Sequence, residues 1–161
     1  MKLPHAFALA LALFVVPVAC HKETRWDEAG QNAEKKAQEK KPEGIKAGSA
    51  FNKFFPADGA EGMQRVYTQE KEGFAEAKLQ KDGKDVATLS ISDTLNNADA
   101  KTKFASATEK VGTHPYMTVG KNQSTALVAD RYQVKVSSQT LDEPTRKAWI
   151  SRFDLSGLSS L

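Results

Sequence analysis

Beyond residue 60, apolar and polar residues alternate along several short stretches of the chain, which is typical of half-buried antiparallel strands. The pattern predicts strands over residues 64–71, 74–80, 86–92, 116–119, 125–129 and 132–137. The first stretch is the most polar, which suits the edge of a sheet. Asp82 and Gly83, between the second and third stretches, form a two-residue hairpin signal. The chain is therefore expected to form a sheet of strands that are joined by short turns.

Apolar residues spaced three and four apart predict three helices, which precede, interrupt and follow the strands. In the first helix, Ser49 can cap the amino end and Pro56 ends the helix. Its inner face carries three aromatic residues, which are Phe51, Phe54 and Phe55. Leaving large apolar side chains in water is unfavourable by roughly 1.5–3 kcal/mol each. This face is therefore expected to dock on the core.

The second helix is predicted over residues 98–111, where one of the two preceding asparagines can cap it and Phe104 lies on its inner face. Gly112 follows in the left-handed position that commonly ends a helix, and residues 112–115 are expected to be a loop. The third helix begins after its cap, Asp142, and has Pro144 in its first turn, where a missing N–H is tolerated. Its inward-facing residues are Trp149, Ile150 and Phe153.

This order of elements, one helix and then βββα twice, predicts a single α+β domain over residues 49–161. The expected architecture is an antiparallel sheet of about six strands with helices packed on it. The two βββα units align at an offset of 45 residues, which places Leu89 on Val134 and Phe104 on Trp149. These aligned pairs raise the hypothesis of a βββα duplication.

The first twenty residues have a different character. Lys2 is followed by an apolar run over residues 6–16, and the small residue Ala19 precedes Cys20, the only cysteine of the chain. The run is shorter than the roughly 20 residues that span a bilayer, and the arrangement has the parts of an export signal. It resembles the lipobox of bacterial lipoproteins, except that Pro17 stands where an aliphatic residue is usual.

The resemblance implies that residues 1–19 are a signal peptide that is removed and that Cys20 receives a membrane-anchoring lipid, including palmitate. A lone cysteine in an exported protein would otherwise invite intermolecular pairing. The alternative is an ordinary secretory signal in which Cys20 has no role. His21 stands where an aspartate would signal inner-membrane retention in Gram-negative cells. The resemblance therefore implies the periplasmic face of the outer membrane if the source is Gram-negative.

Residues 20–48 are interpreted as a lipid-anchored, charged tether. They are rich in Lys, Glu, Gln and Ala, and Trp26 is their only large apolar residue before Ile45. Removal of Lys2 with the signal leaves 22 of the 23 basic residues against 20 acidic ones. Because nucleic-acid-binding proteins concentrate positive charge on one face, this near balance gives no reason to expect nucleic acid as a partner.

Few residues in the sequence suggest chemistry. The mature chain has two histidines, His21 and His114, without nearby residues that would complete a zinc site. It lacks a Gly-x-Ser-x-Gly elbow and a phosphate-binding loop. The sequence therefore predicts no metal, no cofactor and no enzymatic activity. The candidates for a binding surface are Tyr116, Arg131 and His114, because Tyr and Arg are favoured at interfaces.

The sequence as a whole predicts a membrane-anchored envelope lipoprotein whose small α+β domain is a protein- or ligand-binding module. The expected partners are the membrane, through the lipid, and another envelope protein. Two alternatives stay open. One is a small envelope hydrolase whose site assembles only in the fold. The other is a carrier of an apolar ligand, which would need an unfilled cavity between sheet and helices.

Overall fold

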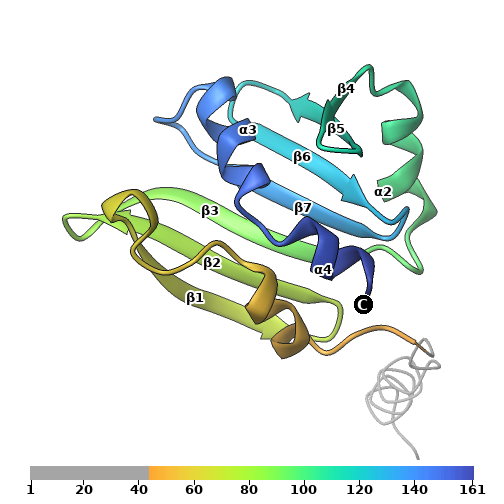
Figure 1. Ribbon diagram of the computed structural model, residues 1–161, viewed down its shortest axis with the longest axis horizontal. Helices are drawn as coiled ribbons and strands as arrows, with labels where there is room; N and C mark the ends of the chain where they lie inside the picture. Colours follow the sequence, from red (N-terminus) through yellow and green to blue (C-terminus); the bar gives the residue numbers. More distant parts are fainter. Residues whose placement is uncertain (1–43) are drawn as a thin grey trace, which may run out of the picture. The chain divides into compact units, whose positions relative to one another are not determined.

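A computed structural model describes residues 44–161, which are coloured in Figure 1. The predictions for the signal peptide, for Cys20 and for the tether up to residue 43 lie outside the described residues. The elements in chain order are η1 (Gly48–Phe54), η2 (Ala60–Gly62), β1 (Gln64–Lys71), β2 (Phe74–Lys81), β3 (Lys84–Asp93), α2 (Ala98–Thr102), η3 (Lys103–Ser106), β4 (Glu109–Val111), β5 (His114–Val119), β6 (Gln123–Val128), β7 (Tyr132–Ser137), α3 (Glu143–Ser151) and α4 (Leu155–Ser159).

The strands form one seven-stranded antiparallel sheet in the order β1-β2-β3-β7-β6-β5-β4. The polar strand β1 lies at one edge, as predicted. Asp82 and Gly83 have φ values of 51° and 73°, the positive angles that a two-residue hairpin turn requires. The domain is thus of the α+β class that the order of elements predicted.

The sheet has one strand more than the expected number, and this strand replaces part of a predicted helix. The prediction of a helix over residues 98–111 is wrong beyond Ser106, where η3 ends, because Glu109–Val111 pairs with β5 as strand β4. Thr108 and Val111 are β-branched, which favours an extended backbone over a helix. Helical spacing of apolar residues in this stretch therefore did not decide its conformation.

The residues after β4 were also assigned incorrectly. Gly112 has a φ of 59°, but it turns the short β4–β5 hairpin instead of ending a helix. His114 and Pro115, which were expected in a loop, begin β5 and pair with Val111 and Lys110. Pro115 lacks the N–H that a central strand needs, but here its neighbouring strand is only three residues long.

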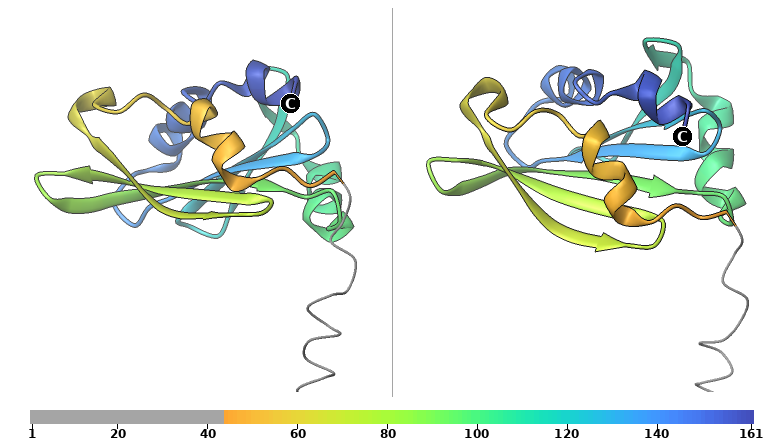
Figure 2. Two further views of the ribbon diagram at one scale, coloured as in Figure 1. Left: turned by 90° about the horizontal axis from the view of Figure 1, so that it is seen from below. Right: turned by 60° about the horizontal axis from the view of Figure 1, so that its bottom comes forward.

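The core lies on the face of the sheet that η1, α3 and α4 cover (Figure 2). The aromatic residues predicted on the first helix are all buried, and the ring of Phe51 meets the edge of Tyr132 with centroids 5.8 Å apart. Ser49 is not the cap of this helix, because Ala47 occupies that position and no side chain caps the helix. The predicted docking of the aromatic face is confirmed, and the predicted cap is wrong.

The last predicted helix is confirmed in its start and in its buried face. The Asp142 carboxylate accepts a hydrogen bond from the Thr145 N–H at 3.0 Å, and Pro144 lies in the first turn. The predicted inward residues are all buried: Trp149, Ile150 and Phe153. A helix that is capped at one end and buried along one face in this way holds its position on strands β6 and β7.

The structure does not confirm the hypothesis of a duplication. Phe104 is buried, but it lies outside the core cluster that contains Trp149. It shares a groove with Leu127, which alternates along β6 with the core residues Ala126 and Val128 and so lies on the opposite face of the sheet. The segments that the alignment equated therefore pack on opposite faces of the sheet.

The first described residues contact the domain, although the sequence placed them in the tether. The Lys46 carbonyl accepts a hydrogen bond from the Gly73 N–H at 2.7 Å, and the Lys46 N–H donates to Asp93 at 3.3 Å. Arg131 donates from Nε and Nη2 to the two carboxylate oxygens of Asp93, at 3.0 and 2.7 Å. Arg131 also donates to the carbonyl of Gly44. Asp93 and Arg131 thus join the start of the domain to β3 and to the β6–β7 turn.

The substitution Asp93→Asn is expected to lower the free energy of unfolding at pH 7 by about 2 kcal/mol, because Arg131 loses a charged, bidentate partner. Burial raises the pKa of Asp93, but the hydrogen bonds from Arg131, Leu95 and Lys46 outweigh it and hold the pKa below 3.8. A depressed folded-state pKa stabilises the protein above the unfolded-state pKa, and this stability is lost as the pH falls through the folded value.

The measurement is urea unfolding of both proteins at a series of pH values. The difference in stability should be constant down to about pH 4 and should shrink below it. A difference of the same size at pH 2 and pH 7 would contradict this assignment.

Candidate functional site

The face of the sheet opposite the core carries mainly polar side chains, and we call it the polar face. The strand register aligns these side chains in rows across β2, β3, β7 and β6. The rows are Lys78–Thr88–Ser137–Gln123, Glu76–Ser90–Lys135–Thr125 and Phe74–Ser92–Gln133–Leu127. Hydroxyl and amide groups therefore dominate the three middle strands of this face, which makes it suited to hydrogen bonding.

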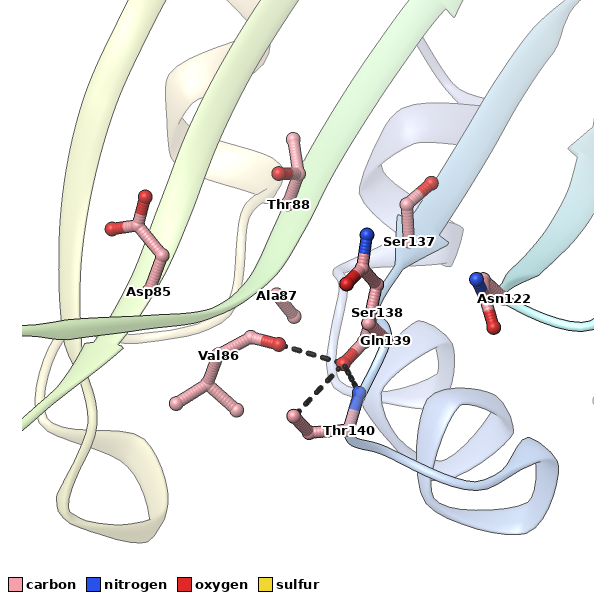
Figure 3. A pocket seen from close by; sticks show the side chains of 9 residues that line it. All are labelled: Asp85, Val86, Ala87, Thr88, Asn122, Ser137, Ser138, Gln139 and Thr140. Carbon is pink, nitrogen blue, oxygen red and sulfur yellow. Dashed lines mark hydrogen bonds between the residues drawn. The ribbon is translucent and has the colours of Figure 1, made fainter.

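A cleft opens beyond the row that contains Thr88 and Ser137, where β7 separates from β3 (Figure 3). The β3–β7 pairing ends at Thr88 and Ser137. Beyond this pair the Ser138 hydroxyl donates to the Val86 carbonyl at 2.6 Å and accepts from the N–H groups of Thr140 and Leu141 at 3.1 and 3.0 Å. The side chain of Ser138 thus replaces the next backbone hydrogen bonds between β3 and β7. The chain after Ser138 turns away from β3, and the cleft lies between this part of the chain and β3.

The cleft has a volume of about 420 Å³ and is lined by Asp85, Val86, Ala87, Thr88, Asn122, Ser137, Ser138, Gln139 and Thr140. Figure 3 shows that these residues come from β3, from the β5–β6 turn, from the end of β7 and from the segment that follows it. Four of the lining side chains have no hydrogen-bonding partner among residues 44–161: Thr88, Asn122, Ser137 and Gln139. Their donors and acceptors are available to a ligand.

The charged group of the cleft is the carboxylate of Asp85. It is ion-paired with Lys78 and accepts a hydrogen bond from Gln80 Nε2 at 2.7 Å. The hydrogen bond from Lys78, and after it that from Gln80, lowers the pKa of Asp85, and the same contact with Asp85 raises the pKa of Lys78. Asp85 is therefore ionised and matched by a cation, so the groups left free in the cleft are neutral.

The three candidate residues from the sequence do not converge on this cleft. Tyr116 is buried on the core side, where its hydroxyl donates to the Glu143 carboxylate and lies 3.0 Å from Ser124 Oγ. Burial, and after it the hydrogen bond to Glu143, raises the pKa of Tyr116 to about 12. The phenol therefore stays protonated at physiological pH and serves the packing of α3.

Arg131 and His114 do not line the cleft either. Arg131 is engaged by Asp93 and by the start of the domain, and its guanidinium lies over the ring of Tyr132, 5.0 Å from the centroid. His114 is half-buried at the start of β5. Within the described part of the chain, no hydrogen bond or ion pair joins Tyr116, Arg131 and His114 to one another.

The residues of the cleft were missed because a serine- and threonine-rich stretch after a strand looks like an ordinary loop. The run Ser137-Ser138-Gln139-Thr140 was the available signal, since these four successive polar, uncharged residues begin at the last residue of the most regular strand and continue beyond it. The sequence could not show that Thr88 and Asn122, which lie 52 and 18 residues before Thr140, face the same space.

Residues 44–161 contain no group of three or more His, Cys, Asp or Glu side chains that could hold a metal ion. None of the helices in this range is long and apolar enough to cross a membrane. Comparisons of the chain with protein-family models, with curated proteins and with solved structures find no match.

Proposed function

We propose that this protein is a membrane-anchored envelope lipoprotein whose α+β domain binds a neutral, hydroxyl- or amide-rich ligand in the cleft between β3 and β7. The observation that supports binding is the set of four unpartnered polar side chains around a cleft of about 420 Å³. Ligand sites of this size use a few placed polar groups to orient the ligand. A glycan, or a polar segment of another envelope protein, has the matching chemistry.

The two alternatives from the sequence have weaker support. A hydrolase needs a base within hydrogen-bond reach of a nucleophile. Among the lining residues of the cleft, the carboxylate of Asp85 is already engaged by Lys78 and Gln80. An apolar carrier needs space between sheet and helices, but the large side chains there are closely packed, with Phe51 and Trp149 almost fully buried. Neutral hydrogen bonding to a ligand is the chemistry that the cleft supports best.

A photo-crosslinking amino acid at position 139 tests the binding site in cells. Gln139 is exposed at the cleft, and Ser156, exposed on α4, is the matched control position. Irradiation should give a specific adduct at position 139, and its mass distinguishes a glycan from a protein. Thr88→Val in the same chain should reduce the yield about two- to tenfold, because a lost hydrogen bond weakens binding by about 0.5–1.5 kcal/mol. Equal adducts at both positions would reject the cleft as the site.

The substitution Cys20→Ser tests the anchor. Because Cys20 is the only cysteine of the chain, the variant should incorporate no labelled palmitate and should keep its signal peptide. Wild-type protein should be labelled and should separate with membranes, and Ser49→Ala is a control that leaves the acceptor in place. Palmitate labelling of Cys20→Ser at the wild-type level would reject the lipoprotein assignment.

A further inference from the structure

The groove that Phe104 shares with Leu127 lies on the face of the sheet opposite the core and has a volume of about 400 Å³. Figure 1 shows α2, which borders it, beside the end of β6. Five of the eight lining residues are apolar: Ala98, Phe104, Ala105, Pro115 and Leu127. Small-molecule sites are typically about 300–1,000 Å³ and mostly apolar, so the groove has the size and the lining for one narrow apolar chain.

Two lysines lie next to this groove. Lys103 directly precedes Phe104, and its ammonium group lies over the Phe104 ring, 5.5 Å from the centroid. Lys135 is on the polar face of β7, two residues from Gln133, which is the register partner of Leu127. Two residues along a strand correspond to about 7 Å. In the described part of the chain no carboxylate forms an ion pair with either lysine, so their positive charge is available to a bound anion.

The two lysines are near enough to affect each other. Burial, and after it the charge of Lys135, lowers the pKa of Lys103. Because like charges repel, an anion beside the two ammonium groups would stabilise both. The neighbouring polar side chains are already paired, since Gln133 Nε2 donates to Thr125 Oγ1 at 2.9 Å and Thr125 Oγ1 donates to the Val134 carbonyl at 3.0 Å. The lysines are therefore the groups that would bind an anion at this place.

The other charges around the groove do not cancel those of the two lysines. Lys101 and Asp130 line the groove and pair with each other at 3.8 Å, and the Asp130 side chain is 82% exposed. Asp99, in the first turn of α2, is exposed and does not line the groove. The charge that stays unpaired next to the apolar lining is therefore that of Lys103 and Lys135.

We propose that this groove binds a single-chain anionic amphiphile of the fatty-acid class. Its alkyl chain would lie along Phe104 and Leu127, and its carboxylate would lie at Lys103 and Lys135. Each methylene that the groove removes from water strengthens binding by a factor of about four, and the carboxylate adds an ion pair. The groove is separate from the cleft between β3 and β7, so this site does not rest on the proposed function.

An NMR titration of the chain over residues 20–161, with Cys20→Ser so that no lipid is attached, tests the site. The probes are octanoate and 1-octanol, which have chains of equal length and different head groups, below the concentrations at which they aggregate. Octanoate should shift the amide signals of Phe104, Ala105 and Leu127 in a saturable manner. Octanol should bind there about two- to fivefold more weakly, because it lacks the ion pair. Hexanoate, with two methylenes fewer, should bind about four- to fifteenfold more weakly than octanoate.

Two variants, each with a matched control, make the test specific. Lys103→Gln removes one cation and should weaken octanoate binding about two- to fivefold without changing octanol binding. Lys81→Gln, at an exposed position at the end of β2, should change neither. Ala105→Glu places a charged side chain at an exposed position of the groove and should remove the binding of both probes. Ala148→Glu makes the same change at an exposed position of α3 and should leave both unaltered.

The proposal is overturned if octanoate and octanol bind equally, or if Lys103→Gln and Lys81→Gln have equal effects. It is also overturned if neither probe shifts the groove signals and only phosphatidylethanolamine–phosphatidylglycerol vesicles perturb them, which would make the groove a contact with the bilayer. Octanoate shifts confined to Thr88 and Gln139 would place the probe in the cleft and would overturn it too. Absence of the photo-crosslink at position 139 would leave these titrations unchanged, so failure of the proposed function and failure of this site are separate outcomes.

Discussion

Trp149→Ala is expected to lower the free energy of unfolding by about 3–5 kcal/mol, which is the usual loss for a large buried aromatic residue and includes the cavity it leaves. Trp149 is 2% exposed and belongs to the core cluster, on the face of α3 that packs against β6 and β7. Because a domain of this size has a total stability of about 5–15 kcal/mol, the melting temperature should fall by more than about 10 °C.

Thermal unfolding followed by circular dichroism measures this loss. Trp149→Phe keeps an aromatic ring in the same space, and its melting temperature should fall clearly less than that of Trp149→Ala. Ala148→Ser, one residue earlier on the exposed side of α3, should change stability by less than about 0.5 kcal/mol. If Trp149→Ala lowered the stability no more than Ala148→Ser does, Trp149 would be a surface residue and the C-terminal helix would be a candidate binding surface.

Arg146→Ala is expected to lower the free energy of unfolding by about 3 kcal/mol, because this arginine is 3% exposed and completes a buried polar cluster. Its Nε donates to Ser124 Oγ at 3.1 Å, and its Nη1 donates to the Leu141 carbonyl at 2.6 Å. Tyr116 has a single hydroxyl proton, which it donates to Glu143, so its oxygen accepts from Ser124. Removal of the guanidinium would leave Ser124 and the Leu141 carbonyl without this donor.

The matched control is Arg152→Ala on the segment that follows the same helix. Arg152 is 42% exposed and pairs with Glu61 at the surface, so its loss should cost less than about 1 kcal/mol. Urea unfolding at pH 7 compares the two variants. The result that would contradict the role of the cluster is a loss for Arg146→Ala no larger than that for Arg152→Ala.

The alternation of apolar and polar residues along the chain determined most of the sheet. It predicted β1 and β7 with their observed bounds, and it placed the hairpin turn at Asp82 and Gly83. The cap at Asp142 and the buried face of α3 were also predicted. Such features depend on neighbours within a few residues, because side chains alternate along a strand and repeat every three to four residues along a helix.

The prediction of a helix failed over residues 98–111, because the apolar residues of this stretch pack on different faces of the sheet. The apolar spacing between residues 98 and 111 fits a helix, but the chain instead uses Phe104 to cover the polar side of the sheet and Val111 to extend it by β4. Similarly, Arg146 looks like a surface residue of an amphipathic helix. It is buried because Ser124 of β6 and the carbonyl of Leu141 accept its hydrogen bonds.

The sequence by itself thus determined the class of the domain, most of its strands and the resemblance of its first twenty residues to a lipoprotein signal. Only the tertiary structure decided which polar residues act together. The cleft forms because Ser138 bonds to Val86, 52 residues earlier, and so separates β7 from β3. The groove that Phe104 shares with Leu127 forms because η3 packs near β5 and β6. Both depend on contacts between distant segments, and local patterns of hydrophobicity carry no information about such contacts.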